Sequence, residues 1–233
     1  GQVFAIMSGT AEKEQIKAIC KSADKYLFDE KAGGYRLNTD FKEEKFDLGR
    51  MFGFAYGEKE NGAVFSHMAV MYANALYKQG FIKEGYKVLK TLLDTAMDFD
   101  RSRMYPGVPE HFDNDGRGLY SYLTGAASWY MLTMIASVYG VHGELGDLVI
   151  SPALMPEQYN ENGDAKVSLE FAGHEFDILV HNSDKIAPEY AQIKRACCDG
   201  IRVETVTEKS VRISKHAIDK LSADRHHTVD IYI

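Results

Sequence analysis

The first 140 residues alternate between apolar stretches with helical spacing and long polar segments. Apolar residues recur every three or four positions in 11–28 and again in 83–99. Both segments are therefore predicted to form helices that bury one face. The segments 61–80 and 124–139 are instead apolar around their whole circumference, so both are predicted to form buried, neighbouring helices. This alternation indicates part of an inner and an outer ring of helices.

The pattern changes after about residue 146. Apolar and polar residues alternate from 165 to 171 and from 176 to 180, with a turn at Ala172-Gly173, and this period is typical of strands. Asp199-Gly200 is a hairpin signal, and 211–213 and 229–233 supply further strands. The chain therefore divides into a helical part, 1–145, and a β-rich part, 146–233.

Composition narrows the classes of partner. The chain has 233 residues and a formal net charge of −7, without a basic run. Nucleic acid and anionic membrane surfaces are therefore not expected as partners. No apolar stretch reaches the roughly 18 to 20 residues that a spanning helix needs. Because the chain opens with Gly1 inside an apolar run, we expect it to be a fragment with sequence missing upstream.

Cysteine and histidine positions argue against disulfides and metals. The three cysteines are Cys20 and the adjacent Cys197 and Cys198, which favours free thiols in a reducing, cytoplasmic compartment. No cluster with zinc-ligand spacing is present, so no metal site is expected. His226-His227 is interpreted as a solvated pair.

Lys59 and Glu60 are the first candidate site residues. They directly precede Asn61, which is a suitable N-cap for the buried helix 61–80. Glu60 would then lie at the mouth of a pocket, where a carboxylate accepts hydrogen bonds from sugar hydroxyls. A charged pair in a loop is more often simply solvated, and residue type alone favours that interpretation.

His67 and Thr124-Gly125 form the second candidate group. His67 is expected two turns into its helix, where a lone histidine is more often a core residue than a functional one. With Thr124 as N-cap, the free amides that begin with Gly125 would lie at the positive end of a helix dipole and form a generic anion site. Glycine would let an oxyanion approach the backbone. A plain cap with small packing residues explains Thr124-Gly125 equally well.

Several segments resemble the inverting glycoside phosphorylases of the cellobiose phosphorylase type. They span essentially the whole chain and comprise 57–67, Tyr105-Pro106-Gly107 with Pro109-Glu110, 123–129 and 143–150. The resemblance implies a fold that is mainly α with a β-rich C-terminal part. Residues 1–145 would be the C-terminal portion of an (α/α)6 barrel, and 146–233 a small β-sheet or sandwich domain.

The resemblance also implies a reaction and site roles. Phosphate would attack the anomeric carbon of a β-linked glucosyl unit and release α-glucose 1-phosphate with inversion. His67, Thr124 and Gly125 would hold the phosphate, and Lys59 and Glu60 would lie at the acceptor sugar. Inorganic phosphate would be a co-substrate, with no other cofactor. The expected partners are a β-linked oligosaccharide and phosphate, with a homodimer as a further expectation for the full-length form.

The general acid of the family is an aspartate on an earlier segment, expected upstream of Gly1. No catalytic residue is therefore assigned here, and Asp40, Asp47 and Asp113 are regarded as decoys. The isolated chain is expected to be inactive. The linkage and acceptor stay open, with a lean toward a β-1,2-linked gluco-oligosaccharide.

Two alternatives remain. An (α/α)6 glycoside hydrolase would use two carboxylates and water, and would need no anion site. A non-enzymatic αα-repeat interaction module would present an exposed concave face and no buried histidine.

Overall fold

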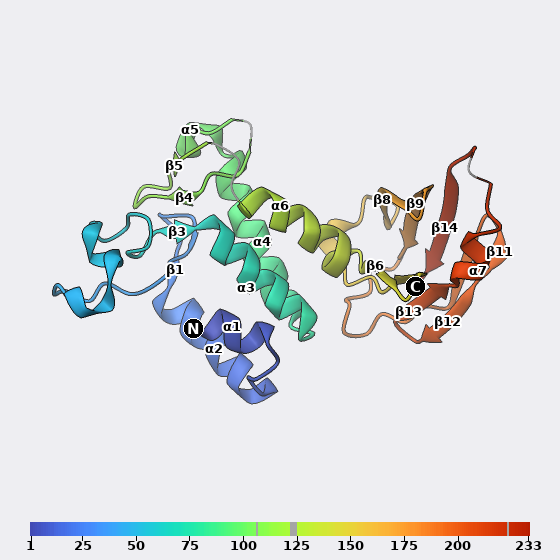
Figure 1. Cartoon of the computed structure of the whole chain (residues 1–233), viewed down its shortest axis with the longest axis horizontal. Helices are drawn as coiled ribbons and strands as arrows, with labels where there is room; N and C mark the ends of the chain where they lie inside the picture. The colour runs from blue at the N-terminus through green and yellow to red at the C-terminus, as the bar shows by residue number, and fades with distance from the viewer. Residues whose placement is uncertain (106, 122–124, 223) are drawn as a thin grey trace. The chain divides into compact units, whose positions relative to one another are not determined.

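The chain folds as two compact units, Gly1–Thr133 and Met134–Ile233. A computed structural model describes residues 1–105, 107–121, 125–222 and 224–233 (Figure 1). No helix within these ranges combines the length and apolar character that crossing a bilayer requires. Cys20, Cys197 and Cys198 are all free thiols.

The first unit contains six α-helices among its described residues. These are α1 (Gln2–Met7), α2 (Lys13–Tyr26), α3 (Ser66–Lys78), α4 (Ile82–Met97), α5 (Phe99–Ser102) and α6 (Gly125–Thr133). Helices α2 and α4 lie where the amphipathic patterns predicted them, with ends shifted by one or two residues. Each places its apolar stripe against the unit and its charged residues outward.

Helix α3 is the centre of this unit, as its apolar circumference predicted. It packs against α1, α4 and α6 (Figure 1), and Ala73, Ala75 and Leu76 are completely buried. A buried hydrogen bond from Asn74 Nδ2 to Thr133 Oγ1 (3.1 Å) joins α3 to α6. The prediction that these two helices are neighbours is confirmed.

Helix α3 begins later than predicted because a small sheet precedes it. The antiparallel strands β3 (Val64–Phe65), β4 (His111–Phe112) and β5 (Gly118–Leu119) pair in that order. The first amide of the helix, Ser66 N, donates to Glu110 O (2.9 Å). Asn61 is therefore not the N-cap; it lies in the preceding loop, and its Nδ2 donates to Phe54 O (2.9 Å).

The prediction of an (α/α)6 barrel is wrong. No closed ring of inner and outer helices forms among the described residues, and helix accounts for about 36% of those residues against 25% strand. The segments between α2 and α3 and between α5 and α6 hold short strands and 3₁₀ turns, including β1 (Phe28–Asp29) and β2 (Gly34–Tyr35). An apolar helix surface requires a packing partner, but it does not specify how many helices close around a centre.

Helix α6 also differs from its prediction. It was expected to be buried on all sides over 124–139, but Met131 and Leu132 are 60% and 51% exposed. The α-helix ends at Thr133, and a π-helical turn, Met134–Val138, opens the second unit. The change of helix type coincides with the boundary between the units.

The second unit is a β-sandwich, which confirms the β-rich prediction for the C-terminal part. One sheet has the order β11-β10-β14-β9-β8 and the other β12-β13-β7-β6. The strands are β6 (Val141–Glu144), β7 (Asp147–Ile150), β8 (Asp164–Phe171), β9 (His174–His181), β10 (Arg195–Cys198), β11 (Ile201–Arg202), β12 (Glu204–Thr207), β13 (Ser210–Ile213) and β14 (His227–Tyr232), with one short helix, α7 (Lys215–Ile218). The predicted turns at 172–173 and 199–200 both join paired strands.

Both sheets contribute to one apolar core. Ile150 and Val211 come from the smaller sheet, and Phe176 and Ile231 from the larger one; all four are fully buried. His227, which was interpreted as solvated, is also fully buried. Its ring nitrogens lie 2.7 Å from an Asp199 carboxylate oxygen and 2.8 Å from Ser222 O, so both polar atoms have partners. Because both ring nitrogens are hydrogen-bonded, a histidine can be buried in this strand at little cost in stability.

A substitution at Gly140 tests how tightly the start of the sandwich is packed. Its φ is +69°, and a Cβ there would lie 1.9 Å from the backbone oxygen of Ser151. We expect Gly140→Ala to destabilise the chain by about 2 to 4 kcal/mol, because the strained φ and the backbone clash add. Gly173→Ala is the matched control: its φ is +79° but the space around it is open, so about 1 kcal/mol is expected. Urea unfolding followed by circular dichroism measures both, and equal losses would contradict the clash.

Candidate functional site

The starts of α3 and α6 meet at His67 and Gly125. His67 is the second residue of α3, so it lies in the first turn rather than two turns in. A Cβ added to Gly125 would be 2.7 Å from Cε1 and 2.9 Å from Nδ1 of the His67 ring. Only glycine fits here without moving the imidazole. Two motifs 58 positions apart in the sequence are thus brought into direct contact.

Two side-chain polar atoms at this junction are buried. His67 packs against Trp129, with ring centroids 5.7 Å apart. Within the described part of the chain, His67 Nε2 and Ser66 Oγ are buried without a hydrogen-bond partner. A buried polar atom left unpaired costs about 1 to 3 kcal/mol, so such atoms are natural partners for a bound group.

The junction has the features of an anion site. Gly125 is the first residue of α6, so its amide has no intrahelical acceptor and lies at the positive end of the helix dipole. Thr124, the predicted cap, lies outside the described residues. The His67 imidazole and the Gly125 amide lie together, so both can donate hydrogen bonds to one oxyanion.

Lys59 and Glu60 diverge from a tight turn. Gly57 N donates to Asn61 O (2.6 Å), and Lys59 has a φ of +44°. Lys59 Nζ lies 3.6 Å from Glu110 Oε2 and 3.8 Å from the centre of the Tyr120 ring. The Glu60 side chain instead pairs with Arg50, with its Oε1 2.8 Å from Arg50 Nη2. The two side chains are neighbours in sequence but not partners.

A cavity of about 510 Å³ opens beside Lys59. Its wall combines aromatic faces, a cation and a carboxylate: Gly53, Phe54, Ala55, Glu58, Lys59, Leu119 and Tyr120. Aromatic rings with a few polar groups are the usual lining of a small-molecule site. Glu60 Oε2 is also buried, without a hydrogen-bond partner in the ranges that the structure describes. The side chains here suit a polar ligand with many hydroxyl groups.

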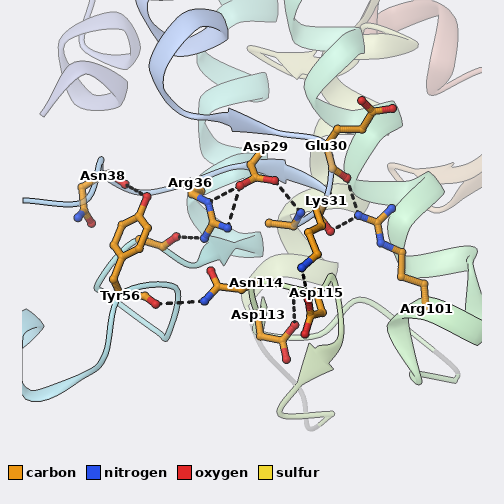
Figure 2. A network of polar contacts seen from close by, with 12 residues as sticks. Asp29, Glu30, Lys31, Arg36, Asn38, Tyr56, Arg101, Asp113, Asn114 and Asp115 are labelled. Carbon is orange, nitrogen blue, oxygen red and sulfur yellow. Dashed lines mark hydrogen bonds and ion pairs between the residues drawn. The ribbon is translucent and has the colours of Figure 1, made fainter. Parts of the chain in front are cut away.

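Arg36 holds the loop that carries Lys59 and Glu60 (Figure 2). Its guanidinium donates from Nε to Asp29 Oδ2 (2.9 Å) and from Nη1 to Gly62 O (2.7 Å), and it lies over the Tyr56 ring. Arg36 is only 8% exposed. Burial raises the pKa of the Asp29 carboxyl, but hydrogen bonds from the Ala32 amide and Arg36 outweigh it and leave that pKa below its usual value.

The other half of this network ties the β1–β2 turn to the turn before β5 (Figure 2). Arg101 Nη2 donates to the backbone oxygens of Glu30 and Lys31, and Lys31 Nζ lies 2.6 Å from Asp115 Oδ1. Asn114 Nδ2 donates to Tyr56 O (3.2 Å), which links this turn to the Lys59 loop. The sequence interpretation missed Arg36 altogether. Arg36 is a single arginine soon after Gly33-Gly34 and is not part of a periodic pattern, so the sequence contained no signal that marked it.

The three decoy aspartates occupy ordinary positions. Asp40 pairs with Lys42 (2.7 Å), Asp47 is exposed in a 3₁₀ turn, and Asp113 accepts amide hydrogen bonds within its own turn. None of the three is assigned as the general acid. Over the described ranges, no three or more His, Cys, Asp or Glu side chains are grouped so that they could hold a metal ion.

Comparison with known proteins gives one family and several relatives. Residues 1–140 match the family model of the glycosyl hydrolase 94 superfamily, catalytic domain. The chain is 27% identical over 209 residues to the cellobionic acid phosphorylase of Neurospora crassa, covering 80% of this chain and 26% of the relative. It is 24% identical over 207 residues to the solabiose phosphorylase of Paenibacillus borealis (85% and 26%). It is 26% identical over 205 residues to the N,N'-diacetylchitobiose phosphorylase of Vibrio proteolyticus (79% and 23%). The chain thus spans about a quarter of each relative's length.

Replacing Arg36 tests the support of the loop. We expect Arg36→Met to lower the free energy of unfolding by about 2 to 3 kcal/mol at pH 7, because Asp29 and Gly62 O lose their donor. Lys31→Met is the control: it removes an exposed ion pair and should cost under about 0.5 kcal/mol.

The same pair of variants has a predicted pH dependence. Because the folded-state pKa of Asp29 is lowered, its stabilisation is present above the unfolded pKa and is lost as the pH falls through the folded pKa. The deficit of Arg36→Met in urea unfolding should therefore shrink in acid. A deficit that is constant from pH 7 to the acid limit would contradict the role given to the Asp29 pair.

Proposed function

This chain belongs to the glycosyl hydrolase 94 superfamily, and from that membership we propose that the protein containing it is an inverting glycoside phosphorylase. A phosphate oxygen attacks the anomeric carbon of a β-linked glucosyl unit while the glycosidic C–O bond breaks. A general acid protonates the departing oxygen, and α-glucose 1-phosphate leaves with inverted configuration. No residue of this chain is assigned as the acid.

The contact between His67 and Gly125 is the observation that carries the proposal. An inverting displacement with an external nucleophile needs a site for that nucleophile in place of a second carboxylate. His67 Nε2, unpaired over the described ranges, and the amide end of α6 supply donors for phosphate. Thr124 completes this site in the proposal.

The cavity beside Lys59 is proposed to receive the acceptor sugar. Phe54 and Tyr120 offer apolar faces for a pyranose ring, while Lys59 and Glu58 in the cavity wall offer a donor and an acceptor for hydroxyl groups. Glu60 does not line this cavity, but its buried Oε2 is proposed as a further acceptor for the same sugar. The relatives are named for cellobionic acid, solabiose and N,N'-diacetylchitobiose, so phosphorolysis is common to them whereas the sugar varies. We assign a β-linked gluco-oligosaccharide as the substrate class. The three free thiols favour a cytoplasmic location.

Phosphate dependence tests the proposed reaction. The full-length protein is incubated with cellobiose, laminaribiose, sophorose and cellobionate, with and without inorganic phosphate, and glucose 1-phosphate is measured. We expect its release from at least one sugar only when phosphate is present. Release of free glucose without phosphate would instead identify a hydrolase, and no turnover of any sugar would favour an interaction module.

The phosphate site is tested by His67→Ala and Gly125→Val in the full-length protein. Each should weaken apparent phosphate affinity or rate by roughly 10- to 100-fold, because one removes a charge-assisted hydrogen bond and the other displaces the imidazole. His226→Ala is the control, since His226 is an exposed histidine of the second unit. If His67→Ala left the phosphate dependence intact, that residue would be an ordinary core histidine.

Glu60→Ala should act on the sugar instead. We expect the KM of the sugar to rise about 10-fold, since a carboxylate that accepts from hydroxyls is lost, while the KM of phosphate changes less than about 2-fold. Initial rates with each substrate varied in turn give both constants. A parallel change in the two constants would contradict a separate sugar role for Glu60.

A further inference from the structure

The three-stranded sheet β3-β4-β5 positions Glu110 and His111 near Lys59. Glu110 directly precedes β4, and its backbone is fixed on both sides. Its amide donates to the oxygens of Leu119 (3.2 Å) and Tyr120 (3.1 Å), and its carbonyl accepts from Ser66 N (2.9 Å). The backbone of Glu110 is therefore part of the sheet that precedes α3, and its side chain starts from a rigid point.

The Glu110 carboxylate reaches Lys59. Its Oε2 lies 3.6 Å from Lys59 Nζ, and both side chains are about one-fifth exposed. On another side, the same ammonium lies over the Tyr120 ring at 3.8 Å. A carboxylate and an aromatic face together define the position of an ammonium that otherwise sits on a flexible four-carbon stem.

His111 in turn limits the movement of Glu110. The imidazole is completely buried, stacked on Phe65 with ring planes 7° apart and packed against Tyr120. Its Nδ1 lies 3.6 Å from Glu110 Oε2 and its Nε2 lies 3.7 Å from Glu58 Oε2. The ring thus lies between the two carboxylates, and the Glu110 carboxylate is in contact with both the imidazole and Lys59.

We propose that Glu110 is a positioning residue that fixes the Lys59 ammonium at the sugar cavity, with His111 as its rigid support. This inference rests on the proposed function, which assigns that cavity to the acceptor sugar. At 3.6 Å the Glu110 carboxylate and the Lys59 ammonium form an ion pair, and in the proposal this ammonium donates to a hydroxyl of the ligand. A lysine held in place before binding loses less side-chain freedom when the sugar arrives.

The role of the Glu110 side chain is separable from that of its backbone. The backbone carbonyl supports the start of α3, next to His67, whereas the carboxylate contacts Lys59. Glu110→Gln keeps the backbone bonds and the side-chain shape and removes only the charge. Its effect should therefore fall on the sugar and not on phosphate.

A double-mutant cycle in the full-length protein tests this. With the best sugar of the four-sugar panel, Glu110→Gln and Lys59→Met should each raise the KM of the sugar about 5- to 20-fold, with the KM of phosphate within about 2-fold. Because Glu110 acts through Lys59, the double variant should be no worse than Lys59→Met alone. Asp94→Asn, which removes the exposed Lys90 pair on α4, is the charge-removal control and should change neither constant.

Several outcomes would overturn the inference. Additive effects in the double variant, or equal changes in both KM values, would make Glu110 a general structural residue. If Glu110→Gln does not fold, the cycle is run with Glu110→Asp, which keeps the charge on a shorter arm; additivity there has the same meaning. A wild-type enzyme that turns over no sugar with phosphate would remove the proposed function as well, whereas an active wild type with an additive cycle removes only the role of Glu110.

Discussion

The arrangement of the first unit depends on which groups accept hydrogen bonds from the N-terminal amides of α3. A buried helix needs acceptors for those amides, and here one comes from the backbone oxygen of Glu110, which lies 44 residues along the chain. That bond joins a three-stranded sheet to the helix. The sheet then determines where the first turn of α3 points, and the first turn carries His67. The geometry of the candidate site is therefore set by strand pairing as much as by helix packing.

A second constraint comes from the absence of a side chain at Gly125. The imidazole of His67 occupies the space that a Cβ would need, so the starts of α3 and α6 approach more closely than any other residue would allow. The Asn74–Thr133 hydrogen bond fixes the far end of the same helix pair. Contacts at both ends hold one register between the helices, and the proposed pair of donors for phosphate depends on that register.

Two enclosed cations in the described part of this unit, Arg36 and Lys59, are each paired. Arg36 reaches a carboxylate and a backbone oxygen at once, and this satisfies a guanidinium that is almost fully enclosed. Lys59 combines a carboxylate with an aromatic face. The sandwich follows the same rule at His227, whose two nitrogens both have partners. The arrangements at Arg36 and Lys59 support the loops beside the candidate cavity, because each links segments that are distant in sequence.

Local pattern was enough to predict the helices α2 and α4, the burial of α3 and the β-rich second unit, because periodicity reports which face of an element is apolar. The motif residues His67 and Gly125 were also found from sequence, as was the family. Tertiary structure alone decided that no barrel closes among the described residues and that α3 begins at Ser66. It also placed Glu110, His111 and Arg36 around the candidate site. Each of these depends on pairing between distant segments, and a one-dimensional pattern contains no information about which partner a strand or a buried charge will find.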